Sequence, residues 1–102
     1  MKTFHHNKYW SASSPDRKDY DNSWCASAVD VADFFKTCKI PWIAYKTLAA
    51  GAIKPEVGLK FAFENGADFT CVGMFDFQVI ENANIVYSIL NSDLKRDREW
   101  YG

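Results

Sequence analysis

The strongest constraint in this sequence is the alternation of short apolar runs with stretches of helical periodicity. An apolar run starts at Trp42, and a second one starts 27 positions later at Phe69. Between them, Pro55 stands at the expected start of a helix and Gly66 just past its end, where these two residue types are favoured. The alternation predicts βα units, in which parallel strands are joined by right-handed crossovers through helices.

One strand and two helices complete the predicted order. Ser27 is a favourable N-cap, and apolar residues follow it at helical spacing until Pro41 forbids further helix. A last helix is predicted over Gln78–Leu90, where apolar residues recur at intervals of three and four. The predicted strands are Lys2–His6, Trp42–Leu48 and Asp68–Met74.

Burial follows from the same pattern. The strand over Trp42–Leu48 is predicted to be buried on both faces apart from Lys46, and Cys71 to be a small buried hydrophobe. The alternating charges of residues 95–99 predict a solvated helix end. Residues 7–23 are polar and predict a long loop, which aromatic side chains either anchor or turn into a sugar or nucleobase site. These aromatic residues are Tyr9, Trp10, Tyr20 and Trp24.

The length of the chain conflicts with the pattern. Three parallel strands form an open sheet with bare edges, whereas a closed barrel of eight strands needs about 200 residues or more. The chain has 102 residues, enough for one domain. It is therefore either a small flavodoxin-like sheet that lacks strands or a piece of something larger.

Two segments favour the second alternative. The stretch from Pro41 to Ile53 leads through the helix to Glu64–Met74, which contains the letters NGAD and VG. These segments resemble the last two βα units of a TIM barrel. With Met1–His6 and Gly73–Phe77, the whole chain resembles the C-terminal third of an uncharacterised bacterial family of TIM-barrel proteins, with a distant likeness to aldo/keto-reductase-like and phosphate-binding barrels. The resemblance implies an α/β fold, a single partial barrel over residues 1–102, and preceding units that are missing from this chain.

Charge and cysteine content exclude several classes. The net charge is -1, which is no electrostatic footprint for nucleic acid or an acidic membrane surface. Three cysteines without CxxC spacing predict neither a disulfide framework nor a metal site, and favour a reducing compartment such as the cytoplasm. No motif for a cofactor is present, so the cofactor stays unknown.

In a barrel, function lies at the carboxyl ends of the strands, and this selects a first group of residues for binding. Lys46, with Thr47 beside it, interrupts an apolar run and can neutralise a substrate anion, form a Schiff base, or pair with Asp76. Small residues after two strands can open backbone N–H groups to phosphate, or only permit tight turns. These small-residue segments contain Ala50, Gly51, Ala52, Gly73 and Met74.

A second group has the chemistry for proton transfer. His5 and His6 are adjacent, so on a strand only one of them points toward a site. His6 is a candidate for moving a proton and His5 for binding substrate, and the alternative is hydrogen bonding in a polar rim. Asp76 can act as an acid or base, but is slightly better placed to cap the following helix.

The resemblance implies an enzyme that acts on a small phosphorylated or polyhydroxylated metabolite, with an isomerase, a lyase or an aldo/keto reductase as the reaction types. Lys46, His6 and Asp76 would then be catalytic. A non-catalytic half-barrel is the main alternative. It would associate with itself or with the missing N-terminal part of the barrel, and the chain alone is expected to be inactive. An independent nucleotide-binding module is weaker, because no phosphate-loop motif is present.

Overall fold

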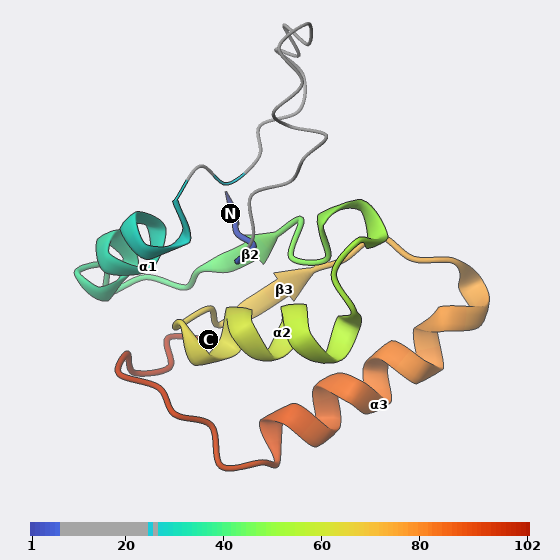
Figure 1. Cartoon of the computed structure of the whole chain (residues 1–102). Coiled ribbons are helices and arrows are strands. Elements are labelled where there is room, and N and C mark those ends of the chain that lie inside the picture. Colours follow the sequence, from blue (N-terminus) through green and yellow to red (C-terminus); the bar gives the residue numbers. More distant parts are fainter. Residues whose placement is uncertain (7–24, 26) are drawn as a thin grey trace, which may run out of the picture.

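The computed structural model describes residues 1–6, 25 and 27–102, which form a three-stranded parallel sheet and three α-helices (Figure 1). The α/β class and the parallel pairing are as predicted. The strands lie side by side in sequence order. They are β1 (Lys2–Thr3), β2 (Ile43–Tyr45) and β3 (Phe69–Cys71). The helices are α1 (Ala28–Lys36), α2 (Pro55–Glu64) and α3 (Val79–Leu90), with 3-10 turns η2 (Ala49–Gly51) and η3 (Asp76–Gln78). The predicted loop over 7–23 and its aromatic residues lie outside the described residues.

Local signals set the helix boundaries as predicted. The Ser27 hydroxyl accepts the N–H of Asp30 at 3.2 Å and caps α1. Helix α2 begins at Pro55 and ends at Glu64, and Gly66 follows with φ +102°, a conformation that glycine adopts without steric cost.

Helices α1 and α2 cover the same face of the sheet. Trp42 from the start of β2 stacks on Phe35 of α1, with ring centroids 4.3 Å apart. Phe4 stacks in the same way on Phe61 of α2, at 5.1 Å. Ala44 at the middle of β2 is fully buried in this cluster. The main core therefore lies between one face of the sheet and two helices.

The opposite face of the sheet is apolar and exposed. Side chains alternate along a strand, so Ile43 and Tyr45 of β2 point away from the helices. They pair in register with Phe69 and Cys71 of β3, and all four are exposed. The prediction that the strand over Trp42–Leu48 is buried on both faces is wrong, and so is the prediction of a buried Cys71, because the helices cover only one face.

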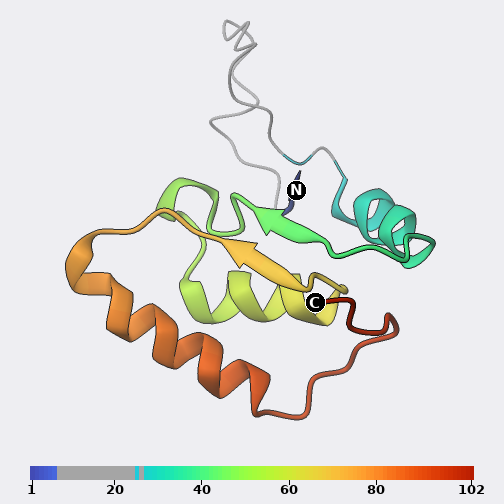
Figure 2. The ribbon, with the colours of Figure 1, turned by 180° about the vertical axis from the view of Figure 1, so that it is seen from behind.

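The strands are also shorter than predicted. Strand β2 ends at Tyr45 because Lys46 has φ +58°, a left-handed conformation that cannot continue a strand. Strand β1 covers two residues, although the N–H of Phe4 still donates to the carbonyl of Tyr45 at 2.8 Å. Figure 2 shows β2 and β3 running in the same direction, as a crossover connection requires.

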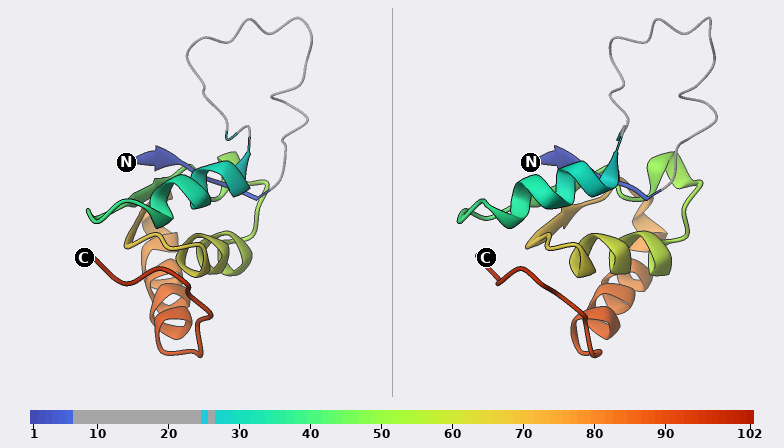
Figure 3. Two further views of the ribbon diagram at one scale, coloured as in Figure 1. Left: turned by 90° about the vertical axis from the view of Figure 1, so that its left-hand side faces the viewer. Right: turned by 60° about the vertical axis from the view of Figure 1, so that its left-hand side comes forward.

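Helix α3 extends the helical layer instead of crossing to the other face. Leu59 and Phe63 of α2 are buried together with Ile89 of α3. Both views in Figure 3 place α2 between α1 and α3. None of the helices in the described ranges has the length and apolar composition that crossing a bilayer requires.

The C-terminal tail returns to the amino end of β3 and forms a buried cluster of charges, which we call the clasp (Asp68, Arg96 and Arg98). Arg98 donates to Asp68 Oδ2 at 2.7 Å, and Arg96 Nη2 lies 3.6 Å from Asp68 Oδ1. The side chain of Asp68 is fully buried and those of the arginines are nearly so. The prediction of a solvated helix end over 95–99 is wrong, because alternation of charge along the chain does not say which charges meet a partner.

The arginines of the clasp also close the ends of two helices. Arg98 Nε donates to the carbonyl of Phe35 at 2.9 Å and Nη1 to that of Gly66 at 2.8 Å. Arg96 Nη1 donates to Phe63 and Ala67 carbonyls at 2.6 and 2.7 Å. The last carbonyls of a helix have no partner within the helix, so these guanidinium groups satisfy them.

Candidate functional site

A cavity of about 640 Å³ opens at the carboxyl ends of β2 and β3. Three segments line it: the turn after β2, the first residues of α2, and the residues between β3 and α3. Parallel strands bring these segments together, because their carboxyl ends meet at one edge of the sheet.

The cavity gathers five of the predicted site residues. These are Lys46, Ala50, Gly51, Gly73 and Met74. Ala52 is exposed and does not contribute to the lining. The structure also places His5, His6 and Asp76 outside the lining.

The turn after β2 has an unusual backbone. Lys46, Ala49 and Ala50 have φ values of 58°, 49° and 56°, in a region that residues with a side chain rarely occupy. Such conformations cost energy and persist only where the surrounding structure enforces them. One enforcing contact is with Gly58 of α2, where an added Cβ would lie 2.7 Å from the carbonyl oxygen of Thr47.

Most backbone N–H groups of this turn are already used inside it. Gly51 donates to the Leu48 carbonyl at 3.0 Å, and Ala52 donates to the Ala49 carbonyl at 3.4 Å. By contrast, no hydrogen bond within the described residues uses the N–H of Gly73 or Met74. The predicted anion cradle is therefore reduced to the N–H groups of Ala50 in this turn and of Gly73 and Met74 after β3.

The charge of the lining is one-sided. Lys46 and Lys54 are both part of it, and none of the described residues in the lining is an aspartate or a glutamate. Lys46 is half-buried, with its Nζ 5.7 Å from the centre of the Tyr45 ring. Two ammonium groups without a carboxylate favour an anionic occupant.

Two buried polar side chains complete the lining. Thr47 is 1% exposed, and its Oγ1 has no hydrogen-bond partner within the described residues. An unsatisfied buried hydroxyl costs about 1–3 kcal/mol, so it is rare in a folded protein without a reason. Asn82 of α3 is also buried, and its Nδ2 donates to Met74 Sδ at 3.5 Å.

The histidines have other surroundings. His5 is buried, and its Nε2 accepts the N–H of Cys25 at 3.0 Å, which ties the start of the chain to the segment before α1. His6 lies beside Phe61 of α2, with ring centroids 5.0 Å apart. On the described contacts both belong to the packing around β1.

Asp76 is exposed and stands in η3, and it forms no ion pair with any other described residue. The predicted cap at Asp76 is wrong. Neither η3 nor α3 has a side-chain cap at its N-terminus, and Gln78 Oε1 instead accepts the N–H of Phe75, the residue before η3, at 3.0 Å. The longer side chain of Gln78 reaches back over the turn, which the short side chain of Asp76 does not do here.

Sequence reasoning missed Lys54 and Asn82 in this site. Lys54 had a signal, because it directly precedes the proline that starts α2 and so stands at a helix N-terminus. Asn82 had none, because α3 also carries Glu81, Asn84 and Ser88, and nothing in the sequence distinguishes Asn82 from them. The described ranges contain no cluster of three or more side chains suited to holding a metal ion. No known protein family, curated protein or solved structure matched the chain when compared with it.

Proposed function

We propose that this chain is the C-terminal part of a TIM-barrel enzyme and that its strand-end cavity binds a small phosphorylated metabolite. The strand order supports the barrel. In a flavodoxin-like sheet the order reverses at a switch point, and helices cover both faces. Here the strands follow in sequence order and α1 and α2 share one face, as they do in a barrel. The exposed apolar face then corresponds to the barrel interior.

The observation that carries the ligand class is the one-sided charge of the cavity. Lys46 and Lys54 neutralise the anion, while the N–H groups of Gly73 and Met74 donate to its oxygens. The unpartnered hydroxyl of Thr47 gains a partner when a polyhydroxylated or phosphorylated ligand enters. Lys54 and these amides lie at or near the starts of α2 and η3, where the backbone adds positive potential.

The share of the reaction that falls to this chain is holding the ligand. Among its described residues, His6 and Asp76 do not reach the cavity, so the proton-transfer groups of an isomerase, a lyase or an aldo/keto-reductase-like enzyme would be supplied by residues other than these two. Lys46 keeps its charge-neutralising role in each of these reactions.

The exposed face formed by Ile43, Tyr45, Phe69 and Cys71 favours a second candidate, a half-barrel closed by another copy of the chain. Light scattering on the purified chain separates the two. A dimer that dissociates when Tyr45→Lys and Phe69→Lys are introduced supports the half-barrel. An aggregated or disordered chain supports a longer parent. A folded monomer would overturn the partial barrel and favour a small self-contained sheet.

Ligand binding is tested by NMR titration of the ¹⁵N-labelled chain with inorganic phosphate, glycerol phosphate and glycerol. We expect the amide signals of Gly73 and Met74 to shift with both phosphates and not with glycerol. Lys46→Met and Lys54→Met should each weaken phosphate binding about tenfold, the effect of losing about 1.4 kcal/mol. Lys60→Met is the matched control, because Lys60 pairs with Glu64 on the outer side of α2. Equal weakening by all three variants, or equal shifts with glycerol, would overturn the proposal.

A further inference from the structure

A second hollow, of about 660 Å³, lies between α2 and α3 and is independent of the strand-end cavity. We call it the α2–α3 groove. Its α3 side consists of residues spaced by three and four, which places them on one helix face. These are Ile80, Glu81, Asn84, Ile85, Ser88 and Ile89, and Phe77 of η3 precedes them at the same spacing. Glu56 at the start of α2 forms the opposite wall.

The groove is apolar in a way that folding alone does not require. Phe77 is 80% exposed and Ile80 is 76% exposed, and both stand at its edge. Single exposed apolar residues are common, but these two adjoin Ile85 and Ile89, which line the same groove while packing on the core of α2. The lined part of α3 spans three turns, or about 17 Å, the length of a short helix.

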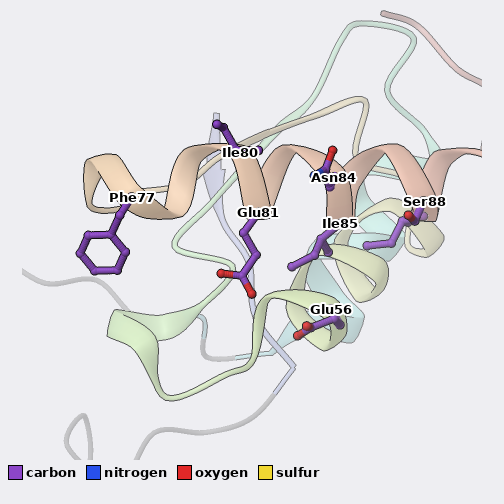
Figure 4. A pocket seen from close by; sticks show the side chains of 8 residues that line it. Glu56, Phe77, Ile80, Glu81, Asn84, Ile85 and Ser88 are labelled. Atoms are coloured by element: carbon purple, nitrogen blue, oxygen red, sulfur yellow. The ribbon is translucent and has the colours of Figure 1, made fainter.

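The charge of the groove is opposite to that of the cavity. Glu81 from α3 and Glu56 from α2 extend into the space between the two helices (Figure 4). Neither carboxylate forms an ion pair within the described residues, and no described lysine, arginine or histidine lines the groove. Two carboxylates that face the same space attract a cation.

We propose that the α2–α3 groove binds an amphipathic helix of a protein partner, which lays apolar residues along α3 and places a lysine or arginine between Glu56 and Glu81. Helices recognised in this way present apolar anchors at intervals of three and four. The two glutamates select the occupant. A second copy docked groove to groove would bring four carboxylates together, and an anionic membrane surface would be repelled.

The test uses two synthetic helical peptides of about 16 residues with the same leucine stripe, one with a central lysine and the other with glutamate at that position. Fluorescence anisotropy with the full chain should show the lysine peptide binding at least tenfold more tightly. Glu81→Gln and Glu56→Gln should remove most of this preference. Glu64→Gln, on the same helix but paired with Lys60, should leave it intact.

Ile80→Ser should weaken both peptides, since it removes an apolar anchor and not a charge. Equal binding of the two peptides would overturn the proposal. So would a preference that survives both glutamine variants, a dimer of the chain that Ile80→Ser dissociates, or binding to vesicles of phosphatidylserine. Phosphate binding at Lys46 should be unchanged in all these variants, so this inference and the proposed function fail independently.

Discussion

The two ends of strand β3 both carry charges, yet they use them in opposite ways. At the amino end, Asp68 accepts hydrogen bonds from Arg98 and from the N–H groups of Trp42 and Tyr101. At the carboxyl end, Lys46 and Lys54 line a cavity to which none of the described residues contributes a carboxylate. The first arrangement supplies every charge with partners from the chain itself. The second places two positive charges around a cavity that an anionic ligand can enter.

Charges that stabilise a small α/β chain can be distinguished from charges that bind a ligand by what happens when one of them is removed. A buried charge whose removal leaves another charge unpaired is structural, because the penalty falls on the fold. Charges of one sign around a hollow cost little when that hollow is filled with water, and they gain energy when an anion enters.

Breaking the clasp should have the largest effect. Arg98→Met removes a buried cation beside the Asp68 carboxylate, together with its hydrogen bonds to Asp68 and to the carbonyls of Phe35 and Gly66. We expect the free energy of unfolding to fall by about 3–5 kcal/mol, measured by urea denaturation. Lys60→Met removes an exposed ion pair and should cost less than about 1 kcal/mol. Similar losses of unfolding free energy for both variants would show that the clasp stabilises the fold no more than an exposed ion pair does.

Filling the contact between α2 and the strained turn should come next. In Gly58→Ala the new Cβ would lie 2.7 Å from a backbone oxygen, that of Thr47, which has no flexible side chain to yield. We expect a loss of about 1–3 kcal/mol from overpacking, offset in part by the better helix propensity of alanine. Phosphate binding should also weaken, because the turn moves. Gly73→Ala points into open space and should leave stability within about 0.5 kcal/mol.

Thr47→Val should raise the stability of the protein and weaken ligand binding. The substitution keeps the shape of the side chain and removes a buried hydroxyl that has no partner in the described structure. We expect a gain of about 1 kcal/mol in thermal or urea unfolding, together with weaker binding of glycerol phosphate. Thr37→Val is the opposite case, since its hydroxyl donates to the Phe34 carbonyl at 2.7 Å, and it should lose stability. A destabilised Thr47→Val would contradict the role given to this hydroxyl.

Low pH should destabilise the protein by protonating Asp68 of the clasp, at the amino end of β3. Burial alone raises the pKa of Asp68, but hydrogen bonds from Tyr101, Trp42 and Arg98 and the charge of Arg98 outweigh it, so the pKa is lowered from 3.8. A lowered pKa in the folded state stabilises the protein above the ordinary pKa. This contribution is lost as the pH falls below 3.8 and through the folded value. Asp68→Asn should flatten this part of a stability–pH curve, and an unchanged slope would contradict it.

Much of the fold was predictable because its signals are local. Ser27 caps α1 with the residue three positions on, and Pro55 and Gly66 bound α2 through their own backbone preferences. For the candidate site, the sequence predicted only its position at the carboxyl ends of the strands. Lys46, Gly51 and Gly73 follow strands, and parallel strands bring such segments together.

The remaining features had no local signal. Asp76 was a plausible cap in sequence, but the path of the backbone gives neither η3 nor α3 a side-chain cap, and Gln78 bonds back to Phe75 instead. The interior or exterior position of Tyr45 and Cys71 depended on which face the helices cover. A pattern of apolar residues cannot supply that choice when both faces of a strand are apolar.

The order of strands and helices and the parallel pairing of the strands could be read from the sequence, because capping, periodicity and proline restrictions act between residues that are close along the chain. Tertiary structure alone decided the clasp and the charge of the two hollows. Arg98 reaches the Phe35 carbonyl across 63 positions, and Lys54 joins Lys46 across a turn whose course depends on Gly58. Such partners are chosen by three-dimensional distance, and hydrogen bonding and Coulomb attraction depend on that distance and not on separation along the chain.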